Sequence, residues 1–270
     1  KKGILKTSLP IPRNLQQLES YIADINERTY HGGKSMMESK KAILVVSFGT
    51  SYNTTREKTI DVIEKKIDEA FPEQKIYRAW TSKMIMAKLL KRDGIKINNV
   101  KEAMEQMRND GITDVIVQPT HVINGIENDL MKEDALSYRV DFHSIAFGTP
   151  LLTSEQDSLD VIDAVVKEFS DLKDHEALVL MGHGTTHYAN SIYAALDYTF
   201  KDKGYPNVHL GTVEAYPSMQ TLLRMVKEQK PKKVKLAPFM IVAGDHARND
   251  MAGDDPESWR CQFEAAGFEV

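Results

Sequence analysis

The chain has 270 residues, of which 41% are hydrophobic and 27% are charged, and its formal net charge is −4 at pH 7. This length is enough for one large core or two ordinary ones, and the composition is typical of a globular protein. Its 35 basic and 39 acidic residues are interspersed, so we expect no nucleic-acid partner. No apolar run reaches the ~20 residues of a transmembrane helix, so we expect no membrane partner either.

Cys261 is the only cysteine. This excludes an intrachain disulfide and a cysteine-rich zinc or iron–sulfur site. The chain opens with Lys1-Lys2-Gly3, and no apolar core of a signal peptide follows. We therefore predict a cytoplasmic protein. The alternative is an exported protein whose signal peptide has been removed.

Residues 1–40 are predicted to form an extension that contains one helix. After Pro12, apolar residues recur at helical spacing, namely Leu15, Leu18, Ile22 and Ile25. The string Gly33-Lys34-Ser35 is similar to the end of a phosphate-binding loop. However, Arg28 stands where that loop needs its first glycine, and no strand precedes it, so we reject nucleotide binding.

From residue 41, predicted strands alternate with predicted helices. The strands are 42–46, 76–80, 115–117 and 144–147. One helix ends near Pro72 and another is capped by Asn98 or Asn99, with its inward face made by Val100, Ala103, Met104 and Met107. This alternation predicts an α/β domain over residues 41–152, with a parallel sheet between helices.

The same order recurs over residues 153–270, which we predict to be a second α/β domain. The strand 178–181 and its glycine-rich loop align with residues 45–46 and 47–51. Residues 213–218 match residues 77–82. The spacing from Pro119 to Gly125 recurs from Pro238 to Gly244. We therefore predict two similar Rossmann-like halves with a cleft between them. Residues 263–270 match the approach to the fourth strand, so we expect a loop and a helix to follow, and the chain as given to be incomplete.

Ligands of open α/β sheets collect outside the carboxyl ends of the strands. At these positions the second half has His183, Glu214 and His246, and the repeat assigns Phe48, Arg78 and Glu127 to the equivalent positions of the first half. Two imidazoles and a carboxylate suit cobalt, iron, nickel or zinc, because no thiolate is present and the oxygen ligands are too few for calcium. His187 lacks the glutamate of a His-Glu-x-x-His motif, so we treat it as secondary.

Several strings carry a family resemblance: residues 44–51, 81–85, 92–94, 123–125, 181–184 (Met-Gly-His-Gly), 213–217 and 242–252 (Val-Ala-Gly-Asp-His-Ala-Arg-Asn-Asp-Met-Ala). They resemble those of the anaerobic sirohydrochlorin cobaltochelatases, class II chelatases related in fold to ferrochelatase. The match runs from about Lys41 to Val270. The N-terminal extension is a departure, and the oligomeric state stays open, a homo-oligomer included.

The resemblance implies insertion of Co²⁺ into sirohydrochlorin for cobalamin synthesis, without ATP and without an organic cofactor. It also implies that His183, Glu214 and His246 bind the metal, with His183 as proton acceptor. Insertion releases two pyrrole protons, so a base is needed beside the ion, and histidine can serve as ligand or base.

Further residues are candidates for contact with the tetrapyrrole. Glu127 is a candidate second base across the macrocycle, and Phe48 could stack on the flat ring. Arg78, Lys83 and Arg248 are available for the carboxylates of sirohydrochlorin, as are Arg56, Lys88 and Arg92.

Other functions stay open. Fe²⁺ or Ni²⁺ could replace Co²⁺, and with Fe²⁺ the chain would be a ferrochelatase for siroheme. A non-catalytic tetrapyrrole or metal carrier would use the same residues. A hydrolase with His183 as base is a third alternative, for which the sequence offers no nucleophile.

Overall fold

The computed structural model describes residues 39–270. The helix predicted within residues 1–40 and the string Gly33-Lys34-Ser35 lie outside the described residues. Within the described part of the chain, no helix combines the length and the apolar character needed to cross a bilayer.

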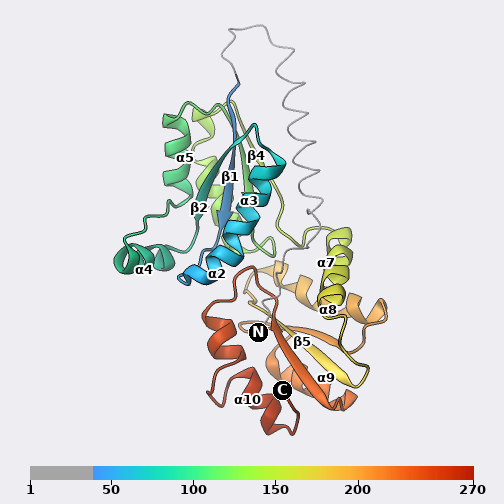
Figure 1. Cartoon of the computed structure of the whole chain (residues 1–270). Helices are drawn as coiled ribbons and strands as arrows, with labels where there is room; N and C mark the ends of the chain where they lie inside the picture. The colour runs from blue at the N-terminus through green and yellow to red at the C-terminus, as the bar shows by residue number, and fades with distance from the viewer. Residues whose placement is uncertain (1–38) are drawn as a thin grey trace. The chain divides into compact units, whose positions relative to one another are not determined.

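The described residues divide into two compact units between Thr153 and Ser154 (Figure 1). The first unit contains β1 (Lys41–Ser47), α2 (Asn53–Lys58), α3 (Ile60–Ala70), β2 (Lys75–Trp80), α4 (Lys83–Asp93), α5 (Val100–Asn109), β3 (Asp114–Pro119), α6 (Ile126–Leu136), the 3₁₀ turn η1 (Arg139–Asp141) and β4 (Ser144–Phe147). The second unit contains α7 (Glu155–Glu168), β5 (Glu176–Gly182), the 3₁₀ turn η2 (Tyr188–Asn190), α8 (Ser191–Asp202), β6 (Val208–Thr212), α9 (Met219–Gln229), β7 (Lys233–Pro238), the π-helical turn η3 (Ala247–Met251) and α10 (Trp259–Ala265).

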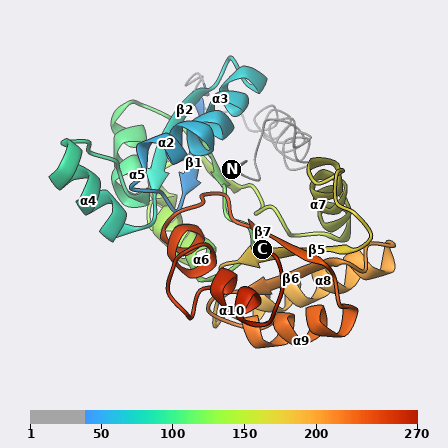
Figure 2. The same cartoon turned by 60° about the horizontal axis from the view of Figure 1, so that its bottom comes forward.

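Each unit is built on one parallel sheet. The strand order is β2-β1-β3-β4 in the first unit and β6-β5-β7 in the second, and all named pairs are parallel. Strands β6, β5 and β7 of the second sheet therefore correspond in order to strands β2, β1 and β3 of the first. This confirms the predicted α/β class and the two Rossmann-like halves with helices around each sheet (Figure 2).

The first sheet is buried on both faces because successive side chains of a strand point to opposite sides. On one face, residues of β1 pack with α5 in a cluster that includes Ala42, Leu44, Val46, Met104 and Met107. On the other face, they pack beside α3 in a cluster that includes Ile43, Val45, Ile67 and Phe71. The predicted inward face of α5 is confirmed, as is its cap at Asn99, which forms a capping box with Glu102.

The second sheet follows the same rule. Alternate residues of β5 pack against α9 and α10 in a cluster that includes Ala177, Val179, Met181, Leu222 and Phe263. At the end of the chain, Glu269 makes an isolated parallel bridge to Lys233, the first residue of β7. Ser144, the first residue of β4, pairs in the same way with Asp114, the first residue of β3. Residues 263–270 therefore do follow the course that leads to β4 in the first unit.

The helix α4 was not among the predicted elements. Leu89 is its one buried residue, while Met84 and Leu90 are exposed. Apolar residues of this helix lie on its exposed side as well as on the side of Leu89, so its sequence does not separate an inward from an outward face clearly. Its ends are well marked nonetheless, since the Ser82 side chain accepts from the N–H of Ile85 and Gly94 adopts the left-handed conformation.

A buried histidine lies on β6. Nε2 of His209 is 2.9 Å from Oε1 of Gln229, whereas Nδ1 has no hydrogen-bond partner. Burial, aided by the charge of nearby Lys201, lowers the pKa of His209 to about 4. The imidazole is therefore neutral at pH 7 and donates from Nε2 to the amide oxygen.

We predict that the second unit loses stability as the pH falls from about 6.5 to about 4. In this window an unfolded histidine binds a proton that folded His209 does not, so protonation favours unfolding, by up to ~3 kcal/mol. His209→Gln should flatten this dependence. The measurement is urea unfolding across the pH range, followed by Trp259 fluorescence in a Trp80→Phe background.

The reporter has to lie in the second unit because burial also lowers the pKa of His121, in the first unit, to about 4. The control is His175→Gln, which changes an exposed histidine of the second unit and should keep the wild-type slope. An unaltered slope in His209→Gln would contradict the assignment to His209.

Candidate metal centre

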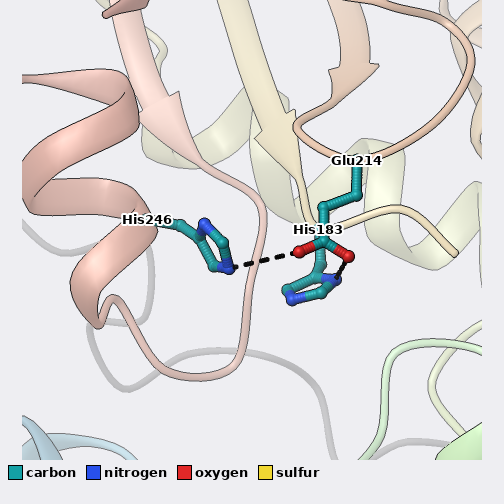
Figure 3. A group of neighbouring side chains, drawn as sticks. All are labelled: His183, Glu214 and His246. Atoms are coloured by element: carbon teal, nitrogen blue, oxygen red, sulfur yellow. Dashed lines mark ion pairs between the residues drawn. The ribbon is translucent and has the colours of Figure 1, made fainter.

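His183, Glu214 and His246 come together in the second unit (Figure 3). One ligand atom from each lies within 4.8 Å of the others, and this is the one such group of three found among residues 39–270. Nδ1 of His183 is 3.7 Å from Oε2 of Glu214, and Nε2 of His246 is 3.9 Å from Oε1. Ligands at ~2.1 Å around a tetrahedral ion are about 3.4 Å apart, so small side-chain movements would close this group around a metal.

The three side chains are accessible from solvent. They are 46%, 52% and 33% exposed for His183, Glu214 and His246 respectively. The two imidazole rings meet edge to face, with their centroids 4.7 Å apart. A divalent ion can therefore enter without unfolding, and part of its coordination sphere would stay open for a second ligand.

His183 is the first residue after β5, and Gly184 lets its loop approach the next one closely. Gly184 has a φ of +87°, and a Cβ there would lie 2.8 Å from Cβ of Thr212 and 3.0 Å from the backbone N of Ala215. Nδ1 of His183 is 2.8 Å from the carbonyl oxygen of Gly184. A carbonyl only accepts, so Nδ1 carries the proton in this contact and Nε2 keeps its lone pair for a metal. The 3.7 Å contact between Nδ1 and Glu214 is then that of a hydrogen-bond donor near a carboxylate and not a spacing between two metal ligands.

Glu214 is held beside His183 because backbone pairing continues past the ends of β5 and β6. The N–H of Val213 donates to the carbonyl of Gly182, and the N–H of Glu214 donates to that of His183, both at 3.0 Å. The N–H of Thr212 then donates to the carbonyl of Pro217 at 2.7 Å and closes the loop.

The register of the two sheets shows that this loop is longer in the second half. Ser47 pairs with Trp80 and Gly182 pairs with Thr212. The helix cap Ser82 follows Trp80 by two positions, whereas the helix cap Ser218 follows Thr212 by six. The second half therefore has four additional residues before its helix, and Glu214 lies within this longer loop.

The predicted equivalence of Arg78 and Glu214 is therefore wrong. Arg78 lies inside β2, where it pairs with Val45, and the sequence alignment matched the two helix caps without allowing for the longer loop. The guanidinium of Arg78 bonds to Asp61 and Glu64 of α3, with Nε 2.8 Å from Oε1 of Glu64. Arg78 thus holds α3 to the sheet and does not stand at the sheet's carboxyl edge.

The other two predicted equivalences are confirmed. Phe48 and His183 each follow the last residue of the central strand. Pro119 pairs with Val46 as Pro238 pairs with Met181. Two residues after Gly125 and Gly244 come Glu127, in the first turn of α6, and His246, just before η3.

Four other predicted residues, Phe48, Lys83, Glu127 and Arg248, are at least partly accessible and lie outside the group of three, whereas the side chain of Arg56 is mostly buried and pairs with Asp61. Phe48 is 39% exposed after β1, exposed Lys83 begins α4, and Glu127 is partly exposed. Exposed Arg248 lies on η3, two residues after His246. His187 is not in the group either; its Nδ1 accepts from the N–H of Ala189 at 3.1 Å and so caps η2.

Two side chains that support the cluster were missed. Oδ1 of Asn190 accepts from the N–H of Thr185 at 3.0 Å, and Nδ2 donates to the carbonyl of Tyr216 at 2.6 Å. Asn190 thus joins the loop of His183 to the loop of Glu214. No sequence pattern indicates this, because its partners are 5 and 26 positions away. Asp250 contacts His246, and its spacing of four residues on a helix was the available signal.

Residues 41–270 match the cobalt chelatase (CbiK) family. The chain belongs to this family. The chain is 40% identical over 229 residues to the sirohydrochlorin cobaltochelatase of Salmonella typhimurium, and the alignment covers 85% of this chain and 86% of the relative. The chain is also 35% identical over 233 residues to the sirohydrochlorin cobaltochelatase CbiKC of Nitratidesulfovibrio vulgaris, and this alignment covers 85% of the chain and 82% of the relative.

We predict that Asn190→Ala weakens Co²⁺ binding by about 10-fold, because the loops of His183 and Glu214 lose a connection and the ligands must be ordered on binding. Asn190→Asp keeps the oxygen that accepts from Thr185 but cannot donate to Tyr216, so it should weaken binding as well. Isothermal calorimetry with Co²⁺ alone measures both.

Asn207→Ala is the matched control. Asn207 also bonds through its side chain to backbone carbonyls, among them that of Glu176 at 3.0 Å, but it precedes β6 at the other end of the sheet. It should leave Co²⁺ affinity unchanged. Wild-type affinity in Asn190→Ala would show that the loop positions do not depend on Asn190.

Proposed function

We propose that this chain is a sirohydrochlorin cobaltochelatase, which inserts Co²⁺ into sirohydrochlorin without ATP in anaerobic cobalamin synthesis. The observation that carries the proposal is the convergence of His183, Glu214 and His246 at one strand edge of a cobalt chelatase family member. The names of both relatives support the same substrate pair.

In this proposal the three residues hold the incoming ion. Imidazole and carboxylate ligands suit Co²⁺, and the charge of Glu214 offsets part of the ion's charge. Three protein ligands leave positions at which pyrrole nitrogens can replace solvent. The ion can then pass to the macrocycle one bond at a time.

Insertion of Co²⁺ into the free-base macrocycle forms bonds to its nitrogens and releases two protons. We assign one proton to His183, which must leave the metal when its Nε2 accepts that proton. Glu127 is the proposed acceptor of the other. Its carboxylate stands in the first turn of α6 and is partly exposed.

Contacts with the rest of the macrocycle are proposals as well. Phe48 has an accessible ring that could stack on a flat tetrapyrrole. Lys83 and Arg248 are exposed cations for its carboxylates. Arg78 is not included, because it is bonded to Asp61 and Glu64. A cytoplasmic location and a homo-oligomer stay predictions from the sequence.

Two related functions would use the same ligands. Fe²⁺ and Ni²⁺ also accept two imidazoles and a carboxylate, so competition among the three ions in the insertion assay identifies the preferred one. A tetrapyrrole or metal carrier would bind its ligands without turnover.

We predict that the protein accelerates the appearance of the cobalt-sirohydrochlorin absorption spectrum over buffer, and that His183→Ala loses about 100-fold or more of this rate, since it removes a ligand and a base. The control is His175→Ala, which changes an exposed histidine just before the other end of β5. If only one molecule of cobalt-sirohydrochlorin forms per protein molecule, or if sirohydrochlorin binds tightly without turnover, the protein is a carrier. If the rate with protein equals the rate in buffer, the proposed chelatase activity is wrong.

Glu127→Gln tests the second base. We expect a kcat lower by about 10-fold or more with unchanged affinity for Co²⁺ alone, because a base is lost and no ligand is removed. Asp129→Asn, two residues along the same helix, should keep the wild-type kcat. If Glu127→Gln has the kcat of the wild type, proton transfer does not involve Glu127.

A further inference from the structure

His246 is joined to a carboxylate that is not among the three cluster residues. Nδ1 of His246 is 2.5 Å from Oδ2 of Asp250, which is 47% exposed. An ionised carboxylate only accepts hydrogen bonds, so Nδ1 carries the proton. The lone pair is then on Nε2, the atom that faces Glu214 at 3.9 Å (Figure 3).

The π-helical turn η3 determines this pairing. Residues four apart on a helix lie on the same side, and two such pairs occur here. Ala247 and Met251 are buried in the cluster that packs on β5, while His246 and Asp250 stand next to them in the chain and are partly exposed. The buried pair packs in this cluster and so anchors the turn that carries the exposed pair. π-helical turns are frequent at functional sites.

The chain leaves this turn at a position that only glycine permits. The N–H of Gly253 donates to the carbonyl of Asn249 at 3.0 Å, and a Cβ on Gly253 would lie 2.3 Å from that oxygen. The close approach ends the turn just beyond Met251. The spacing between His246 and Asp250 is therefore a property of a well-defined piece of backbone.

We propose that Asp250 is a positioning residue for the metal ligand His246. It fixes the ring and its tautomer and strengthens Nε2 as a donor to the ion, without itself touching the metal. The inference rests on the proposed function of this site. It also distinguishes the two imidazoles, because Nδ1 of His183 bonds to the neutral carbonyl of Gly184. His246 is then the anchoring ligand, and His183 is the one that is released during insertion.

The test compares Asp250→Asn, Asp250→Ala and His246→Ala in the full chain, with Co²⁺ alone as the probe. For both Asp250 variants we expect Co²⁺ affinity to fall 10- to 100-fold, with the visible spectrum of bound Co²⁺ unchanged because the ligands are the same. In the insertion assay, KM for Co²⁺ should rise while kcat at saturating Co²⁺ stays near the wild-type value. A variant that is partly misfolded would instead show a lower kcat, so a raised KM with unchanged kcat distinguishes the positioning role from a folding defect.

Asp254→Asn is the control. Asp254 lies shortly after the same turn, and its exposed carboxylate pairs with Arg260. It should bind Co²⁺ as the wild type does. If His246→Ala loses Co²⁺ while both Asp250 variants keep it, the positioning role is wrong and the metal site stands. If His246→Ala keeps wild-type affinity, both the site and the inference are wrong. If the Asp250 variants alter the Co²⁺ spectrum as His246→Ala does, Asp250 is a ligand, which overturns the positioning role.

Discussion

The parallel pairing of β5 with β6 and β7 is the constraint on which the candidate metal centre depends. It brings the carboxyl ends of three strands to one edge, and its hydrogen bonds continue beyond the strands, from Val213 to Gly182 and from Glu214 to His183. Because these bonds join backbone atoms, the positions of His183 and Glu214 do not depend on their side chains. Side chains that are not needed for folding are available for chemistry.

The two halves share this pairing but differ in the loops after their strands. In the first half, β2 leads within two residues to the cap of α4; in the second, the loop is longer and contains Glu214. At the end of the central strand, Phe48 in one half corresponds to His183 in the other. A repeated scaffold with different loops thus carries the candidate metal-binding group in the second unit and an accessible aromatic ring in the first.

The ligands are supported by groups that do not belong to the cluster. Asn190 joins two loops, the carbonyl of Gly184 accepts from one imidazole, and the carboxylate of Asp250 accepts from the other. Such contacts limit the orientations that partly exposed side chains can adopt, so less ordering is needed when the ion binds. If the site passes its metal to a tetrapyrrole, as proposed, these contacts keep the three side chains in place during the transfer.

By itself, the sequence determined the strands, the repeat and two positions of the candidate metal site, because apolar runs ending in glycine and the Pro–Gly spacing are local patterns. It also indicated that Glu214 belongs to the site, although the alignment to Arg78 was wrong. Only the tertiary structure decided the longer loop after β6, the bonding of Arg78 to α3 and the contacts of Asn190. These features depend on the register between strands and on partners up to 26 positions apart. A local sequence pattern does not specify which distant backbone atoms come into contact.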